Sequence, residues 1–175
     1  MSEYSAHEPM QQHLRSRLTR TVEALRKNRF DACWVATKEE ALEEVRATLR
    51  EGAVVASGGS MTLAECGILS LLRSGAYQYL DREAVPREEI PALYRKAFSA
   101  DFYLMSSNAV TENGELYNVD GNGNRVAALI YGPERVIVRV PLIPRFNTPE
   151  DQARSAEALR AMGVTRLDLF DYVIR

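Results

Sequence analysis

The amino-acid sequence predicts an α/β fold in which a largely parallel sheet is covered by helices on both faces. Short apolar runs, which suit strands, alternate along the chain with stretches whose apolar residues recur every three or four positions, as on one face of a helix. The strand-like runs are apolar throughout, which is typical of parallel strands buried on both sides. With 175 residues, of which 46% are hydrophobic, we expect one domain spanning 1–175.

The first part of the chain predicts a helix, a strand, a second helix and a second strand, in that order. An amphipathic N-terminal helix is indicated by the apolar residues Met10, Leu14, Leu18, Val22 and Leu25. Thr37 and Glu40 form a capping box that begins the second helix, and Gly52 ends it. The strands are expected at 30–36 and 53–57.

The middle of the chain begins with a glycine-rich bend and continues the alternation of helices and strands. After the bend we expect a helix at 63–74 with Gly75 at its C′ position, a strand at 77–80, a helix at 87–98 and a strand at 102–106. These strands and helices fit repeated crossovers of a parallel sheet.

The segment from 109 to 133 departs from this alternation. Asn113-Gly114 is a strong hairpin signal, and the sequence GNGN at 121–124 predicts a second chain reversal. The run that follows fits a short helix with Asn124 as N-cap, or a strand, and the helix is favoured.

The last part of the chain predicts one more strand, a helix and a terminal strand. The first strand is expected at 136–140 and the terminal strand at 166–174. Thr148-Pro149 has the N-cap and N1 arrangement of a helix start, and Gly163 ends that helix.

Charge and hydropathy exclude several classes of partner. The net charge of −2 gives no basic surface, so we expect neither nucleic acid nor an anionic membrane as a partner. The chain has no apolar stretch of about 18 residues, and its N-terminus lacks the order of a signal peptide. A cytoplasmic protein is therefore expected.

The cysteines and histidines predict no metal site. Cys33 and Cys66 have no metal-ligand spacing and are expected to be buried thiols. His7 and His13 fall on different faces of a helix. We therefore expect no bound metal, no cofactor and no Ser-His-Asp triad.

The glycine-rich bend at 58–62 is the first candidate site. Gly58 and Gly59 would let backbone N–H groups approach a phosphate or carboxylate, and the ligand-binding candidates extend through Ser60, Met61 and Thr62. The alternative is a purely structural turn, in which Thr62 and Glu65 form a capping box.

The polar segment at 106–125 is the second candidate site. Glu112 and Asp120 are the candidate catalytic carboxylates, and the candidate ligand-binding residues are Ser107, Asn108, Asn122, Asn124 and Arg125. The alternative is that these residues serve turns, with Asp120 bracing the reversal and Arg125 on the surface. Because both segments follow the carboxyl ends of parallel strands, we expect them to share one pocket.

The sequences ASGGSMTLAECGILSLLRSG and YRKAFSADFYLMSSNAVTENGELYNVDGNGNRVAALIYGP, with the spacing between them, resemble the lactate-utilization (LUD) domain family. The resemblance covers about 18–135. It implies the three-layer Rossmann-like fold of ribose-5-phosphate isomerase, glucosamine-6-phosphate deaminase and the acyl-CoA transferases. It also implies a link to oxidation of L-lactate to pyruvate, alongside iron–sulfur oxidoreductase subunits.

Two residue roles follow from the resemblance alone. The superfamily uses a glycine-rich turn after a strand to hold an acidic group, which implies binding roles for Gly58, Gly59, Ser60 and Thr62. The segment Thr111-Glu112-Asn113-Gly114 is similar to the one in which acyl-CoA transferases carry a nucleophilic glutamate.

From 136 to 175 the sequence instead resembles the late barrel segment of radical-SAM activases for glycyl-radical enzymes, without their cysteine motif. This part is expected to supply a borrowed helix and strand that replace the missing edge of the LUD sheet. Three hypotheses follow. The chain is an enzyme domain for a small carboxylate, phosphate or thioester, a non-catalytic subunit of an iron–sulfur oxidoreductase, or a degenerate domain.

Overall fold

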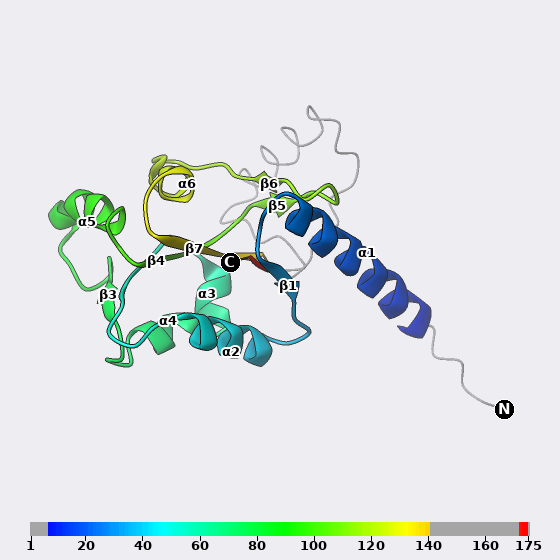
Figure 1. The fold of residues 1–175 in the computed structure, drawn as a ribbon. Coiled ribbons are helices and arrows are strands. Elements are labelled where there is room, and N and C mark those ends of the chain that lie inside the picture. Colours follow the sequence, from blue (N-terminus) through cyan, green and yellow to red (C-terminus); the bar gives the residue numbers. More distant parts are fainter. Residues whose placement is uncertain (1–6, 141–171, 175) are drawn as a thin grey trace.

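The computed structural model describes residues 7–140 and 172–174 (Figure 1). Its helices are α1 His7–Lys27, α2 Lys38–Thr48, α3 Met61–Glu65, α4 Ile68–Leu72, the 3₁₀ helix η1 Arg87–Glu89, α5 Ile90–Ala97 and α6 Asn124–Ile130. Its strands are β1 Ala32–Trp34, β2 Val54–Ser57, β3 Gln78–Leu80, β4 Phe102–Ser106, β5 Ala109–Val110, β6 Leu116–Tyr117, β7 Arg135–Val140 and β8 Tyr172–Ile174. The expected helix begun by Thr148-Pro149 lies outside the described residues.

The main sheet has the strand order β1-β8-β7-β4-β2-β3. The four adjacent strands β7, β4, β2 and β3 are parallel to one another, which confirms the predicted α/β fold with a parallel sheet. β8 is antiparallel and pairs with β7 on one side and β1 on the other. The C-terminal strand was expected at an edge of the sheet. It lies inside the sheet instead, because both of its sides are hydrogen-bonded.

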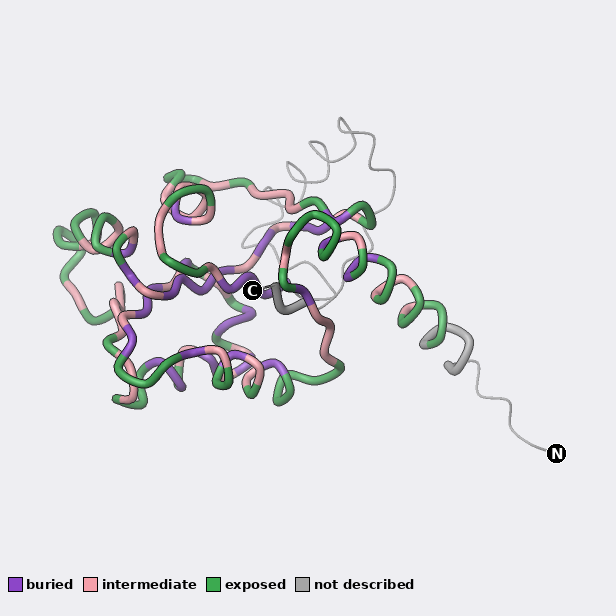
Figure 2. The backbone as a smooth tube through the Cα atoms, in the orientation of Figure 1, coloured by how far each residue is buried: buried purple, intermediate pink, exposed green. Residues whose placement is uncertain are grey.

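Helices cover both faces of the sheet, and each face has its own apolar core. α2, α3 and α4 lie on one face, and α5 and α6 lie on the other (Figure 1). Phe102 and Leu104 of β4 pack in the core beside α2–α4, whereas Tyr103 and Met105 pack in the opposite core. Successive side chains of a strand point to opposite faces, so a strand buried on both faces is apolar at every position. Buried residues accordingly follow the central strands in Figure 2.

The helix expected at 63–74 is two short helices. Gly67 adopts the left-handed region with φ of 71° and separates α3 from α4. The N-cap of α3 is Ser60, whose side chain accepts a hydrogen bond from the Leu63 amide at 3.2 Å. The predicted capping role of Thr62 is therefore wrong, because Thr62 lies inside α3 and is buried. Gly75 was predicted at the C′ position but lies one residue beyond it, since Arg73 is the C-cap.

Three smaller expectations have mixed outcomes. The segment at 124–130 is a helix, as favoured, but its N-cap is Gly123 and Asn124 is its first residue. Cys66 is buried, whereas Cys33 is only partly buried. None of the described helices is long and apolar enough to cross a membrane.

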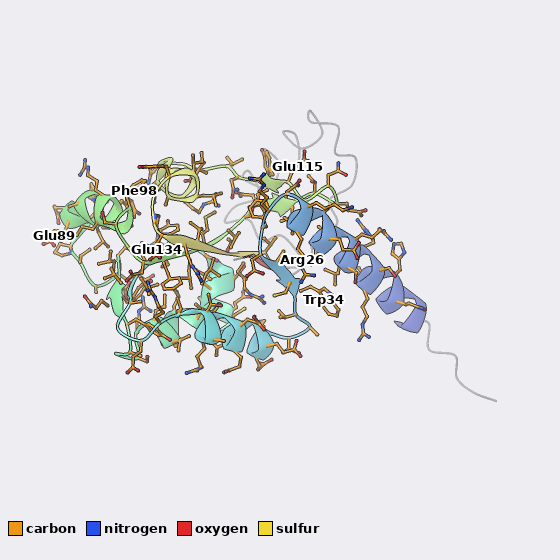
Figure 3. All side chains as sticks on the ribbon, in the orientation of Figure 1. Arg26, Trp34, Glu89, Phe98, Glu115 and Glu134 are labelled. Carbon is orange, nitrogen blue, oxygen red and sulfur yellow. The ribbon has the colours of Figure 1, made fainter. Side chains whose placement is uncertain are left out.

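Arg26 and Phe98 link neighbouring elements (Figure 3). The Arg26 Nε–H donates to the Ala32 carbonyl at 2.9 Å and ties the end of α1 to β1. Phe98 follows α5, and a Cβ built on Gly132 would lie 3.0 Å from its ring, so the ring reaches the end of α6.

The predicted Asn113-Gly114 hairpin is confirmed, and it packs on the end of α1. β5 and β6 pair in antiparallel fashion, and Gly114 has a φ of 79°. The Asn28 side-chain amide donates to the Asn113 and Gly114 carbonyls at 3.0 and 2.9 Å. A Cβ on Gly114 would lie 2.6 Å from the Ala24 carbonyl carbon, so the backbones of hairpin and helix are in direct contact.

We predict that Gly114→Ala destabilises the protein by at least about 2 kcal/mol, because it adds a left-handed strain and a clash with backbone. The measurement is the free energy of unfolding in urea. Gly121→Ala is the matched control, since Gly121 is outside the left-handed region and a Cβ there has open space. Equal stability of the two variants would contradict the described packing of the hairpin on α1.

Candidate functional site

The two predicted segments lie next to each other at the carboxyl end of the sheet. The Gly58 amide donates to the Leu104 carbonyl at 2.9 Å, and the hydroxyls of Ser60 and Ser106 are hydrogen-bonded to each other. A Cβ built on Gly58 would lie 3.1 Å from the Tyr103 hydroxyl and 3.2 Å from Cδ of Arg125. The absence of a side chain at Gly58 therefore lets the segment at 106–125 approach this bend.

The guanidinium of Arg125 holds the second segment together. Its N–H groups donate to Asp120 Oδ1 (3.1 Å), the Ser106 carbonyl (2.6 Å), Asn118 Oδ1 (2.7 Å), Asn108 Oδ1 (3.0 Å) and the Val119 carbonyl (2.8 Å). A guanidinium has five N–H donors, so these contacts use all of them. Arg125 therefore fills the space between the two bends, and all of its N–H donors already have acceptors.

The predicted catalytic residue Asp120 is part of the same network. One carboxylate oxygen accepts from Arg125, and the other accepts from the Val126 amide at 2.9 Å. The second contact gives an acceptor to a backbone N–H in the first turn of α6, where N–H groups have no hydrogen-bond partner within the helix. These contacts correspond to the bracing role that was the alternative for Asp120.

The other predicted catalytic residue, Glu112, lies on the hairpin against α1. It forms an ion pair with Arg17, and Arg20 lies 4.0 Å away. Its side chain is 47% exposed. The structure thus places Glu112 beside two arginines of α1, one largely buried and one exposed, and none of its described contacts is with the glycine bend.

The remaining candidates are spread over the surroundings of the two bends. Ser107 is buried, and its hydroxyl is within hydrogen-bond distance of the Ala109 and Tyr117 carbonyls at 3.1 and 3.0 Å. The Asn108 side chain accepts from the Val119 amide at 2.9 Å. Met61 and Asn122 are exposed. Asn124 alone among the predicted residues lines the pocket described next.

A pocket opens beside the glycine bend, on the face of the sheet covered by α5 and α6. About 310 Å³ of space, open solvent included, lies between its lining groups, which come from β2, β3, β4, α5, α6 and the loop after β3. The lining residues are Ala56, Ser57, Leu80, Arg82, Leu93, Tyr94, Ala97, Tyr103, Asn124 and Ala128. The pocket thus combines apolar walls with one cation and several hydrogen-bonding groups.

Arg82 provides the positive charge of this pocket. A Cβ on Gly59 would lie 2.9 and 3.0 Å from its two terminal nitrogens, so the guanidinium lies directly over the glycine bend. Within the described part of the chain, Arg82 has no ion pair or hydrogen bond. The acids beside it in sequence, Asp81 and Glu83, instead accept from Arg73 at 2.6 and 2.8 Å. Arg82 is therefore free to pair with a ligand.

Tyr103 adds a neutral hydrogen-bond donor. The residue is 3% exposed, and its hydroxyl lies beside Gly58. Burial raises the pKa of Tyr103 to about 12, because the phenolate would lose its hydration. The hydroxyl therefore keeps its proton at neutral pH and can donate to an anion in the pocket.

The comparisons with known proteins identify the family. A family model described as the LUD domain matches residues 18–161. The chain belongs to the LUD domain family. The match runs past Arg135, where the resemblance was expected to end, so the LUD domain includes the last parallel strand, β7. LUD domains are implicated in lactate utilization. No curated protein and no solved structure matches this LUD domain.

Sequence reasoning missed Arg82 and Tyr103 for different reasons. Arg82 follows the strand at 77–80, so its place at the carboxyl end of a parallel strand was an available signal. Tyr103 belongs to an apolar run, and its sequence context predicts only a core residue. That its hydroxyl reaches the pocket depends on the neighbouring Gly58.

We predict that Arg125→Lys destabilises this LUD domain by about 3 kcal/mol, since an ammonium cannot replace five donors in a planar fork. Urea unfolding gives the free energy, and hydrogen exchange should show faster exchange at 106–126. Arg87→Lys, at an exposed position, is the control. Unchanged exchange in Arg125→Lys would show that the guanidinium does not hold the segment.

We predict that the free energy of unfolding falls as pH rises from about 10 to about 12, because Tyr103 ionises more readily in the unfolded chain than in the folded protein. In this interval the unfolded chain has released the Tyr103 proton while the folded protein retains it, so stability is lost with rising pH. Tyr103→Phe should lose less stability over this interval and should remove one tyrosine transition near pH 12 from an absorbance titration. Tyr131→Phe, at an exposed position, should leave that transition in place.

Proposed function

We propose that this LUD domain binds a small organic acid in the pocket beside Arg82, with the carboxylate against the guanidinium. The proposal rests on the Arg82 guanidinium, which has no hydrogen bond or ion pair within the described residues and lies over Gly59 in the lining of a pocket with apolar walls. A guanidinium is suited to a carboxylate because paired N–H groups match its two oxygens.

The other pocket groups favour a short carboxylic acid over a bare phosphate or a large thioester. Tyr103 and Asn124 add polar contacts for a hydroxyl or carbonyl next to the carboxylate. Ala56, Leu80 and Ala128 supply apolar contact for a short carbon chain. A 2-hydroxy or 2-oxo acid has this combination of groups, which agrees with the link between LUD domains and lactate utilization.

We propose that the domain binds and orients this acid while another subunit supplies the oxidation chemistry. The described lining of the pocket includes no carboxylate, histidine or cysteine that could serve as general base or nucleophile. Asp120 is committed to Arg125 and the start of α6. We propose an iron–sulfur oxidoreductase subunit as this partner, since that is the partner that the LUD resemblance implies.

We also infer that the fold is the three-layer Rossmann-like fold of ribose-5-phosphate isomerase and the acyl-CoA transferases. The parallel strands β7, β4, β2 and β3 with helices on both faces support this inference. So does a pocket at the carboxyl ends of neighbouring strands, which is the general ligand position in open parallel sheets.

We predict that L-lactate or pyruvate stabilises the protein and that Arg82→Gln weakens this effect at least tenfold in half-saturating concentration. A ligand at 100 times its Kd adds about 2.7 kcal/mol, which is roughly a 5–10 °C rise in Tm. A thermal-shift titration at constant ionic strength measures both. Phosphate and acetyl-CoA are included as probes for the other ligand classes.

Arg95→Gln is the matched control, because Arg95 is exposed on α5 and does not line the pocket. It should respond to lactate and pyruvate as the unmodified protein does. Equal responses of Arg82→Gln and Arg95→Gln, or no response of the unmodified protein to either acid, would contradict the proposal.

A further inference from the structure

Arg139 of β7 is a buried cation on the opposite face of the sheet from the Arg82 pocket. The residue is 1% exposed, and its Nε and Nη1 atoms have no hydrogen-bond partner within the part of the chain that the structure describes. Neither the hydrogen-bond network of Arg125 nor the pocket beside Arg82 includes it. It is thus a separate feature that the proposed function does not use.

A guanidinium in this position requires a negative partner. Arginine keeps its charge in proteins and cannot become neutral when it is buried. A buried and uncompensated charge costs several kcal/mol, and a buried polar group without a hydrogen bond adds to that cost. An anion held against Arg139 would remove both costs.

The strand register places the Ser106 side chain beside Arg139, and the Ser60 hydroxyl is bound to Ser106. Ser106 is the Cα partner of Arg139 across the parallel pair of β4 and β7, so the two side chains leave the sheet on the same face. That face is the one covered by α2–α4, because Ile137 and Leu104, two residues earlier on the two strands, pack there. The Ser106 hydroxyl is hydrogen-bonded to that of Ser60.

We propose that Arg139, Ser106 and Ser60 form a second anion site, which takes the carboxylate or phosphate group of a small molecule. The guanidinium supplies the charge and paired N–H groups. The Ser60 oxygen accepts from the Leu63 amide, and one hydroxyl proton is shared between the two serines. The remaining hydroxyl proton is available to an anion oxygen. Ser60 and Ser106 are partly exposed, so the site opens to solvent at the serine pair.

The test uses the full chain with Arg82→Gln, so that binding in the pocket on the other face is weakened at least tenfold. Tm is followed while phosphate, or separately lactate, replaces chloride at constant ionic strength. We expect a saturable rise in Tm with at least one of the two anions, and which anion acts distinguishes a phosphate site from a carboxylate site. Adding Arg139→Met should abolish the saturable rise. Adding Arg135→Met, at the exposed start of the same strand, should preserve it.

The stability of Arg139→Met in anion-poor buffer gives an independent readout. If no anion is bound there, replacing the unpaired cation with an apolar side chain of similar length should leave Tm unchanged or raise it. A much lower Tm in that buffer would show that Arg139 is already paired within the protein and would overturn the proposal.

Ser106→Ala provides a variant that leaves Arg139 in place. We expect it to raise the half-saturating anion concentration about tenfold, which corresponds to the loss of one hydrogen bond to a charged group. A saturable response of unchanged midpoint in Ser106→Ala, or no saturable response to either anion in the Arg82→Gln chain, would also overturn the proposal.

Discussion

The hydrogen bonds of the Arg125 guanidinium are the interaction on which the arrangement of the site depends. They join the end of β4, the chain reversal before α6 and the side chains of Asn108, Asn118 and Asp120 into one unit. The segment between β4 and α6 has only the two-residue strands β5 and β6 as regular structure. The hydrogen bonds from Arg125 to backbone and side-chain oxygens of this segment therefore stabilise it, as regular backbone hydrogen bonds stabilise a sheet or a helix. Because the aliphatic part of Arg125 also lies against Gly58, the same residue sets the distance between the two bends.

The distribution of charge around the bends separates structural cations from a cation that can bind a ligand. All N–H groups of Arg125 donate to oxygen atoms of its own segment. Arg73 donates to Asp81 and Glu83, the two acids that neighbour Arg82 in sequence. Arg82 is left over the glycine bend with an open pocket beside it. Binding a carboxylate is more favourable in free energy for a guanidinium without internal partners than for one that must first break its internal hydrogen bonds, since breaking a buried pair is costly. The proposed binding role of Arg82 thus depends on which arginines already have partners within the described residues.

The sequence was sufficient for the elements that periodicity and turn chemistry determine. The parallel strands, the Asn113-Gly114 hairpin and the meeting of the two bends follow from apolar runs and from the rule for carboxyl ends of strands. The break at Gly67 was not predictable, because an isolated glycine inside an apolar pattern also occurs within helices. The roles of Arg125 and Arg82 were not predicted either, although the place of Arg82 after a parallel strand was an available signal. Arg125 lies at the start of a helix and Arg82 lies after a strand, and their different roles depend on the hydrogen-bond partners that each has within the described residues.

We propose that the Arg82 guanidinium, and not that of Arg125, binds the carboxylate of the ligand. This proposal is tested most directly by NMR of the arginine Nε–H groups during a titration with L-lactate, with Arg82→Gln used to assign the Arg82 signal. We expect the Arg82 signal to shift and saturate while the Arg125 signal, whose Nε–H donates to Asp120, stays in place. A saturable shift of the Arg125 signal with an unmoved Arg82 signal would contradict the account.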